Sequence, residues 1–461
     1  MAQGKDGTRR VSARLVEDEE YQLRYERACG IDVAKASGMA CTRLPPDRAG
    51  GRRVALLEEV AATVPAVTAL GGRLLEAGVE MVSMESTSDY WRLWYYVLES
   101  CGLRVQLVSS SQARQLAGRP KSDALDAQWL ARLTEMGLLR PSFVPPPEIR
   151  ELRDYTRARL HKAQDRTREW QRLEKLLEGA LIKVSSVASS LQSKSVLDMI
   201  AALISGERDP RALAGLARTS MRAKMADLEH ALTGMFDDHH AELARMLLDH
   251  IGYLDRQVAR LDDAIAACLD KIPAARGADA DGAILPASAD AGDAAVLPAA
   301  ARLAEIPGVS ELLARNIIAE IGLDMTRFPT PGHLVSWAGL TPVTAQSGKR
   351  QARGKKGHGD TYAKNAATQA ANGAARTRTF LGERYHRIAR RRGNARALVA
   401  TARSILVIIW HLLNDPTARF TDLGHDHYAR KTDKDRKLRG HVRQIQALGF
   451  QVTITPAGNA A

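Results

Sequence analysis

The chain has 461 residues, which is enough for two or three domains with a sizeable core. It carries 66 Lys and Arg against 53 Asp and Glu, a formal net charge of +13, and folded proteins this basic often bind nucleic acid. The four cysteines lie far apart without metal-site spacing, which argues against a zinc site and a disulfide framework, and the charged N-terminus lacks the apolar core of a signal peptide.

A first domain, predicted over residues 26–146 after a loose tail over residues 1–25, has an α/β pattern. Short apolar runs predict five strands, at residues 25–34, 38–44, 52–60, 79–86 and 103–109. Amphipathic runs predict two helices between them, at residues 67–78 and 89–102. This order favours a sheet with helices packed on it.

A further helix, predicted over residues 121–133, places two carboxylates on one face. Asp123 and Asp126 are three residues apart and therefore project from the same side of a helix. An apolar stripe beside them is expected to anchor the helix to the core. This stripe consists of Leu125, Trp129, Leu133 and Met136.

Four acidic residues are expected to meet at one edge of the first domain. Asp32 and Glu85 end two predicted strands, and Asp123 and Asp126 lie in the helix after the fifth strand. Strand C-termini and neighbouring helices of an α/β sheet converge on one edge. Four carboxylates there would repel one another without cations, so the pattern favours two Mg²⁺ ions. Taken singly, each acid is better explained as a solvated surface charge, and pairing with Lys121 and Arg132 is an alternative for Asp123 and Asp126.

The rest of the chain is predicted to be mostly helical. Residues 147–271 have the long amphipathic patterns of helical hairpins or coiled coils, and residues 272–301 have the composition of a flexible linker. Residues 302–420 form a C-terminal domain whose opening Pro-Gly turn resembles a helix-hairpin-helix element, although a plain helix start explains it equally well. The apolar run at residues 404–413 is too short to span a membrane and predicts a buried core helix. Residues 421–461 predict a tail with one more helix and a strand.

The positive charge is concentrated in one region. Between Lys349 and Arg403 there are 15 basic and 2 acidic residues, an excess as large as that of the whole chain. We expect contacts to nucleic-acid phosphates here, while a solvated helix face is the alternative for the second basic run. The residues expected to bind are Lys349, Arg350, Arg353, Lys355, Lys356, Arg390, Arg391 and Arg392.

Several separate motifs resemble those of a known family, in the family's order. They are GIDVAK, MEST, KSDALDAQWLA, IRELRDYTR, IPGV followed by IIAEIG, and WAGLTPVTAQSGK, within a similarity that runs from about residue 26 to beyond residue 410. The sequence is similar to the DEDD-type transposases of insertion-sequence family one-ten. These are bridge-RNA-guided recombinases with a RuvC-like N-terminal domain and a distinct C-terminal transposase domain.

The resemblance implies a fold, a site and partners. It implies a RuvC-like (RNase H-like) first domain, a helical middle segment and a mainly helical transposase domain. It implies that the metal-binding catalytic set is Asp32, Glu85, Asp123 and Asp126. It also implies action on DNA with a bridge RNA, as a homodimer or homotetramer, in the cytoplasm and in association with the nucleoid.

The resemblance also implies a nucleophile. Ser347 lies beside Gly348 in a loop rich in Lys and Arg, where the residues alone indicate only a turn. The nucleophile of the family's transposase domain is the serine of this Ser-Gly motif, which implies that Ser347 attacks DNA during excision and integration of the element. Ser336 and Thr344 are the nearby hydroxyls for comparison.

Two other functions remain open from the residues alone. The first is a RuvC-like, metal-dependent junction nuclease that hydrolyses DNA with water and leaves Ser347 unused. A covalent protein–DNA adduct separates it from a transposase. The second is a nucleic-acid-binding scaffold whose carboxylates are structural, which Mg²⁺-dependent cleavage of DNA would exclude.

Overall fold

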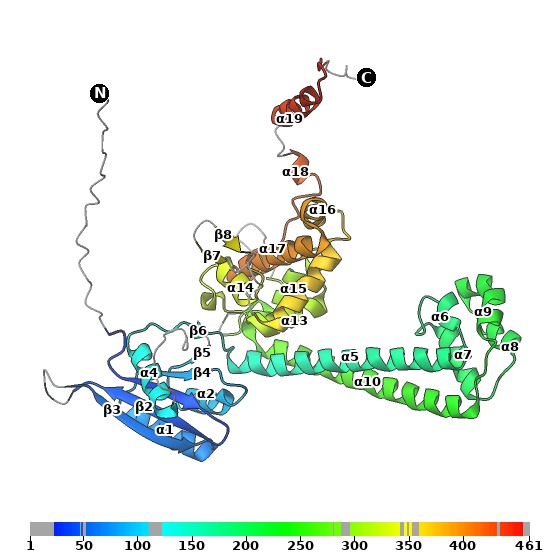
Figure 1. Ribbon diagram of the computed structural model, residues 1–461. Coiled ribbons are helices and arrows are strands. Elements are labelled where there is room, and N and C mark those ends of the chain that lie inside the picture. The colour runs from blue at the N-terminus through cyan, green and yellow to red at the C-terminus, as the bar shows by residue number, and fades with distance from the viewer. Residues whose placement is uncertain are drawn as a thin grey trace, which may run out of the picture. The chain divides into compact units, whose positions relative to one another are not determined.

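The structure is a computed structural model (Figure 1). It describes residues 23–46, 48, 52–109, 122–279, 281–286, 296–341, 345–347, 350–352, 359–430 and 434–454, with the backbone alone described at 345–347, 350–352, 429–430 and 434–437. The chain divides into two compact units, Met1–Val144 and Pro145–Ala461, and each has its own hydrophobic core.

A six-stranded sheet in the order β3-β2-β1-β4-β5-β6 forms the centre of the first unit. Three strands run parallel to one another: β1 (Ala28–Val33), β4 (Met81–Glu85) and β5 (Val105–Val108). Three run antiparallel to their neighbours: β2 (Ser37–Leu44), β3 (Val54–Ala61) and β6 (Pro141–Ser142). The five predicted strands are confirmed, and the short β6 was not predicted.

One face of the sheet is covered by α1 (Val64–Glu76) and α2 (Trp91–Ser100). Side chains alternate along a strand, so every second residue of β1 points to this face. The core between them includes Cys29, Ile31, Val33, Leu70, Leu74, Trp94 and Leu98. Burial raises the pKa of the Cys29 thiol to about 12, in keeping with a packing role for this cysteine.

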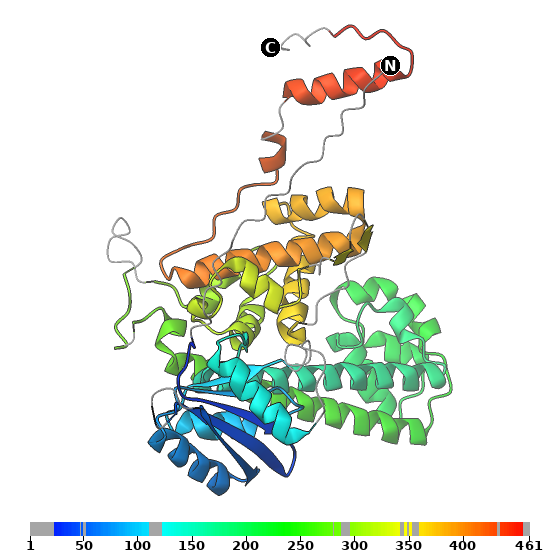
Figure 2. The same ribbon diagram turned by 60° about the vertical axis from the view of Figure 1, so that its left-hand side comes forward.

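The other face of the sheet is covered by α4 (Asp123–Glu135), which lies across the strands in Figure 2. The alternation along β1 turns Gly30 and Asp32 toward this helix. A sheet in this order with helices on both faces confirms the predicted α/β, RuvC-like fold of the unit.

The helix α4 is confirmed, but its apolar stripe was partly wrong. Leu133 is buried, whereas Leu125 is 37% exposed. The helix instead packs through Ala127 and Ala131, both fully buried. These small side chains let the helix backbone approach β1 closely, which a stripe of large residues would prevent.

Two long helices of the second unit, α5 (Pro147–Gly179) and α10 (Asp238–Lys271), pack along each other (Figure 1). Later residues of α5 meet earlier residues of α10, so the helices run antiparallel, as the predicted hairpin requires. The ion pairs that show this are Arg159–Asp262 and Arg166–Asp255.

The residues between the long helices form a small helical cap where α5 ends and α10 begins. It consists of α6 (Val184–Val187), α7 (Lys194–Ile204), α8 (Pro210–Gly215), the 3₁₀ helix η1 (Thr219–Lys224) and α9 (Met225–Ala231). Its core includes Leu173 and Leu177 of α5 and Ile251 of α10. The sequence predicted a helical segment here but not a separate cap.

The C-terminal helices pack around α17 (Asn394–Asn414), a core helix as predicted, which buries Ile405, Leu406 and Ile409. The other helices of this region are α11 (Pro273–Arg276), α12 (Ala299–Ala304), α13 (Glu311–Ile321), η2 (Met325–Arg327), α14 (Pro331–Trp337), α15 (Thr361–Ala374) and α16 (Phe380–Arg392). Of these, α11 packs on α10 and α12, and α13 packs on α5, α12 and α15. Among the described helices, α17 alone is long and apolar enough to cross a membrane by length and composition, but α12, α14, α15 and α16 pack against it.

The Pro-Gly turn joins α12 to α13 and is packed against α15. Gly308 has φ of +88°, and a Cβ at this residue would lie 2.2 Å from the carbonyl oxygen of Ala370. The Ser310 hydroxyl accepts a hydrogen bond from the Leu313 N–H (3.3 Å) and caps α13. Helix packing and capping therefore account for the residues that resemble a helix-hairpin-helix element.

The predicted linker and tail are more ordered than their composition suggested. The linker region contains α11, the start of α12 and a β-bridge between Ala278 and Ile284. The tail contains α18 (His427–Arg430) and the predicted helix, α19 (Lys434–Ala447). The predicted strand is wrong for residues 448–454, which form no strand.

Candidate active site

Asp32 and Glu85 lie at the same level on adjacent parallel strands. The register pairs Ile31 of β1 with Met84 of β4, and each acidic residue is the next along its strand. Residues at one level of neighbouring parallel strands point to the same face and are about 4.8 Å apart between strand axes. The two carboxylates therefore share the face that α4 covers.

The direction of α4 follows from three contacts along it. A Cβ on Gly30 would lie 2.3 Å from the Ala131 nitrogen and 2.7 Å from the Ala127 carbonyl oxygen, so this stretch lies directly over β1. Further along α4, Glu135 binds Arg43, and Arg43 pairs with Ala28 at the start of β1. The helix thus runs antiparallel to β1, and its first turn lies toward the C-terminal end of the strand.

The rise per residue of β1 and of α4 shows which part of the helix lies near Asp32. Asp32 lies two residues beyond Gly30, a rise of about 6.6 Å along the strand. The same distance along a helix is slightly more than one turn, which leads from the turn at Ala127 and Ala131 back toward the first turn of α4, where Asp123 lies. Asp126 lies in the same first turn. From the strand register and the direction of α4, we infer that all four predicted acids face the same edge of the sheet, which we call the acidic edge.

The residues of the acidic edge are at least partly exposed to solvent. Two of them also suit the start of a helix. Asp123 is exposed, and Asp32, Glu85 and Asp126 are half-buried. Ser122 caps α4 by accepting a hydrogen bond from the Leu125 N–H (3.3 Å). Carboxylates in the first turn of a helix also interact favourably with its dipole, so Asp123 and Asp126 suit this position with or without a metal.

The donor set of the acidic edge suits a hard divalent cation. Four carboxylates offer oxygen ligands alone, the chemistry that Mg²⁺ prefers, and the exposed positions leave room for water ligands. The edge is not a closed cage. Among the described residues, one group has three ligand atoms within 4.8 Å of one another, and it lies elsewhere, at Asp237, His239 and His240.

That group is a helix cap. The Asp237 N–H donates to His240 Nδ1 (3.2 Å) while the Asp237 carboxylate accepts from the backbone of His240, which caps α10. A neutral His240 whose Nδ1 accepts a hydrogen bond carries its proton on Nε2, which then has no lone pair for a metal. The positive end of the helix dipole also disfavours a cation there.

The third acidic residue of α4 has a different role. Glu135 is buried and pairs with Arg43 and with Arg53, whose Nε lies 2.8 Å from its Oε1. Thr134, its neighbour, shares a hydrogen bond with Ser83 of β4, with the hydroxyl oxygens 2.7 Å apart. These contacts fix the C-terminal half of α4 on the sheet, and no local sequence pattern predicted them.

Ser347 lies on a β-hairpin of the second unit. β7 (Ala345–Ser347) pairs antiparallel with β8 (Arg350–Ala352), and Ser347 and Arg350 form the last of its three backbone pairs. Of the two hydroxyl residues chosen for comparison, Ser336 is exposed on α14. Thr344 lies outside the described residues.

The structure describes the predicted nucleic-acid-binding residues to three different extents. Arg390, Arg391 and Arg392 are exposed in the last turn of α16. Arg350 is described by its backbone in β8. Four others lie outside the described residues: Lys349, Arg353, Lys355 and Lys356.

Comparison with known proteins identifies both units. Residues 29–182 match a DEDD model for IS110 elements, described as a transposase, and residues 300–387 match the Transposase IS116/IS110/IS902 family. The first match contains the acidic edge and the second contains Ser347. A solved structure of RuvC from Thermus thermophilus is 15% identical, covering 25% of this chain and 99% of that chain with a TM-score of 0.20. No curated protein matches the chain.

Proposed function

The chain belongs to the IS116/IS110/IS902 family of transposases, enzymes that act on DNA, and from this premise we propose that it excises and integrates its own insertion sequence with two chemical groups. One group is the acidic edge, and the other is the hydroxyl of Ser347. The observation that carries the proposal is the level register of Asp32 and Glu85, with the first turn of α4 on the same face.

The acidic edge would hold divalent cations through Asp32, Glu85, Asp123 and Asp126. Two bound Mg²⁺ ions would neutralise charge on a scissile phosphodiester and on the oxygens that attack and leave. The protein's own contribution is to hold four oxygen donors on rigid elements, two on strand ends and two on a capped helix. Its open, exposed position suits a substrate as large as a DNA strand.

Ser347 would supply the covalent step. Its oxygen forms a bond to phosphorus as the bond to one sugar oxygen breaks, the serine proton passes to a base, and the departing oxygen takes up a proton. The phosphoserine ester conserves the energy of the DNA linkage, and attack by another sugar hydroxyl reverses the step and rejoins the strand. Neighbouring basic side chains would stabilise the charge that develops on the phosphate.

Membership of the family supports a proposal about the nucleic-acid and protein partners of the chain. We propose that the chain acts in the cytoplasm on the ends of its element and on target DNA, guided by a bridge RNA, as a dimer or tetramer. An oligomer would allow the acidic edge of one protomer to work with Ser347 of another, because the two groups belong to separate compact units.

The test is a cleavage assay on DNA carrying the element ends, with Mg²⁺ and the bridge RNA. We expect a covalent protein–DNA adduct that the Ser347→Ala protein does not form and the Ser336→Ala and Thr344→Ala proteins do. Mg²⁺-dependent cleavage without any adduct would support a junction nuclease instead. No cleavage of any DNA would leave a binding scaffold.

The sharing of sites between protomers has its own test. The Ser347→Ala and Asp123→Ala proteins are each expected to be inactive alone. Mixing them should restore strand exchange if one protomer supplies the acidic edge and another the serine. Complete lack of recovery would show that each chain completes its own site.

A further inference from the structure

A buried carboxylate joins α5 to the C-terminal helices. Glu320, near the end of α13, has a side chain that is 3% exposed. The Arg157 guanidinium of α5 donates to both of its oxygens, Nε to Oε1 at 2.8 Å and Nη2 to Oε2 at 2.7 Å. Arg153, one turn earlier, donates through Nε to the Ala319 carbonyl oxygen at 3.1 Å and lies 3.2 Å from Glu320 Oε2. Burial raises the pKa of Glu320, and both arginines oppose that shift.

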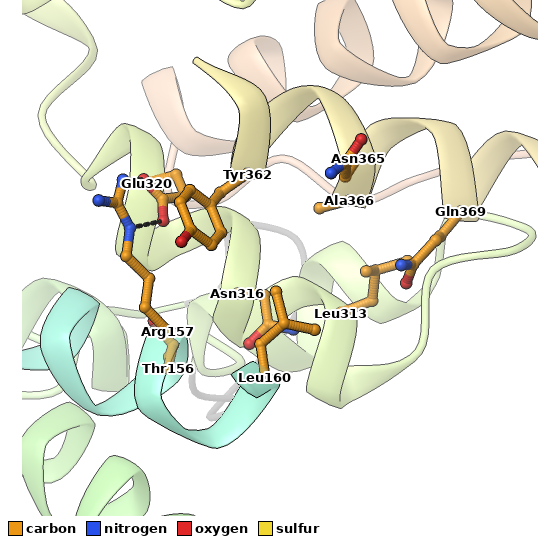
Figure 3. Close-up of a pocket in the computed structure, with 10 residues that line it drawn as sticks. All are labelled: Thr156, Arg157, Leu160, Leu313, Asn316, Glu320, Tyr362, Asn365, Ala366 and Gln369. Atoms are coloured by element: carbon orange, nitrogen blue, oxygen red, sulfur yellow. Dashed lines mark hydrogen bonds and ion pairs between the residues drawn. The ribbon is translucent and has the colours of Figure 1, made fainter. Parts of the chain in front are cut away.

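Arg157 also reaches the start of α15. Its Nη2 donates to Asp360 Oδ2 at 3.4 Å, and its guanidinium lies 4.1 Å from the centre of the Tyr362 ring, a cation–π distance. Asp360 is the N-cap residue of α15 and accepts from the Ala363 N–H at 2.7 Å. One arginine therefore ties α13 and α15 to α5, as Figure 3 shows for Glu320 and Tyr362.

Asp360 lies where the chain returns from the segment that carries Ser347. The Asp360 N–H donates to the Trp337 carbonyl oxygen at the end of α14 (3.2 Å). A Cβ on Gly359 would lie 2.2 Å from the Gly339 nitrogen, so residues 339 and 359 are in close backbone contact. The chain leaves the bundle and comes back at one place, and the β7–β8 hairpin lies between these two points in sequence.

The pocket beside this cluster does not suit a ligand. It is lined by Arg157, Glu320 and Tyr362 with Asn316, Asn365 and Gln369, but its volume is about 40 Å³ (Figure 3). Such a cavity has room for bound water and no more. The cluster is thus better explained by what it holds in place.

We propose that Arg157 is a positioning residue for Ser347, acting through Asp360 on the base of the serine-bearing segment. The inference rests on the proposed role of Ser347. It adds a positioning contact, between Arg157 and Asp360, that the sequence motifs did not predict. A buried ion pair seldom stabilises a fold more than apolar residues of the same volume. A planar guanidinium with two fixed partners does, however, hold its neighbours in one orientation. Through it, the long α5 helix is coupled to the hairpin that presents the nucleophile.

The test uses a substitution that removes the ion pair between Arg157 and residue 360 and keeps the N-cap hydrogen bond of α15. Asn caps helices as well as Asp does, so Asp360→Asn deletes the charge facing Arg157 without uncapping α15. We expect the rate of adduct formation on element-end DNA to fall at least about tenfold, since small misplacements of a reacting group cost this much or more. DNA affinity should stay within about twofold, because neither residue is among those expected to contact phosphate.

A matched control lies two residues along α5. Arg159 pairs with Asp262 of α10 through both ends of its guanidinium, and this contact touches neither α13 nor α15. The Arg159→Gln protein should form the adduct at the wild-type rate. In a double-mutant cycle, Arg157→Lys and Asp360→Asn should be non-additive, whereas Arg159→Gln and Asp360→Asn should be additive.

Amide hydrogen exchange separates this proposal from the chemistry on which it rests. Peptides covering residues 338–364 should exchange faster in Asp360→Asn and Arg157→Lys than in wild type or Arg159→Gln, whether or not an adduct forms. If wild type forms no adduct but this pattern holds, the serine chemistry fails and the positioning contact stands. Equal exchange in all four proteins, or an unchanged adduct rate in Asp360→Asn, would overturn the proposal.

Discussion

Gly30 lies directly beneath Ala131, so close that a Cβ on the glycine would come within 2.3 Å of the alanine's backbone nitrogen. This contact between β1 and α4 sets the height of the helix above the sheet. It therefore also sets how near the carboxylates in the first turn of α4 come to Asp32. The added carbon would meet backbone atoms of α4 and not a flexible side chain. The helix itself would therefore have to move.

Gly30→Ala is accordingly expected to impair cleavage although it removes no acid. Overpacking of this kind costs roughly 1–3 kcal/mol, and we expect the upper part of that range because backbone must shift. The measurements are the free energy of unfolding and the rate of DNA cleavage.

Gly72→Ala is the matched control for Gly30→Ala. Gly72 lies within α1, and a Cβ there would meet nothing within 4 Å. Replacing a helical glycine with alanine stabilises by about 0.5–1 kcal/mol, so this protein should be slightly more stable and fully active. Full activity in Gly30→Ala would show that the position of α4 does not govern the site.

The acidic edge is expected to bind Mg²⁺ in the folded protein without DNA. A ligand that binds only the folded state stabilises it by about 2.7 kcal/mol at 100 times its Kd. Mg²⁺ should therefore raise the unfolding temperature of the wild type and have a much smaller effect on Asp32→Asn or Glu85→Gln. Each of these substitutions should abolish cleavage while leaving the protein folded in metal-free buffer. Equal responses to Mg²⁺ in wild type and variants would argue against metal binding at this edge.

Substitution of Glu135 is expected to reduce stability without preventing cleavage or Mg²⁺ binding. Its buried carboxylate pairs with two arginines, and removing one member of a buried pair costs roughly 3–5 kcal/mol. Arg43 and Arg53 are about one-fifth exposed, so water would compensate part of the loss, and we expect about 2–3 kcal/mol for Glu135→Gln. Cleavage per folded molecule should persist, and Mg²⁺ should still stabilise the variant. Unchanged stability would contradict a structural role for this residue.

The sequence allowed the acidic edge to be predicted because its parts are local. Asp32 and Glu85 each follow an apolar run, and the order of strands and helix brings them to one side of a sheet. The contacts that fix the edge could not be predicted in the same way. Gly30 with Ala131 and Ser83 with Thr134 join residues far apart in sequence, and neither pair has a local signal.

The same limit applies to the second unit. The long helices are evident from their periodicity, but the small cap between them depends on packing among short helices with few turns. Glu320 did leave a trace, an acidic residue in the apolar run NIIAEIG, and such a residue needs a buried partner. Nothing in the sequence pointed to Arg157 as that partner, 163 residues earlier.

The last turn of α16 gives a prediction about DNA or RNA binding. Arg390, Arg391 and Arg392 are exposed there, where cations also suit the helix dipole, so exposure alone does not distinguish a binding surface from a solvated helix end. The salt dependence of nucleic-acid affinity distinguishes these two cases. Each phosphate contact contributes about 0.9 to the slope of log affinity against log salt on duplex DNA, so replacing all three with alanine should flatten the slope by up to about 2.7. A matched loss of charge on α5, at the exposed Arg168, Arg172 and Lys175, should change the slope much less. An unchanged slope in the first variant would mean that these arginines contact no phosphate, and equal changes in both would mean that net charge alone decides the affinity.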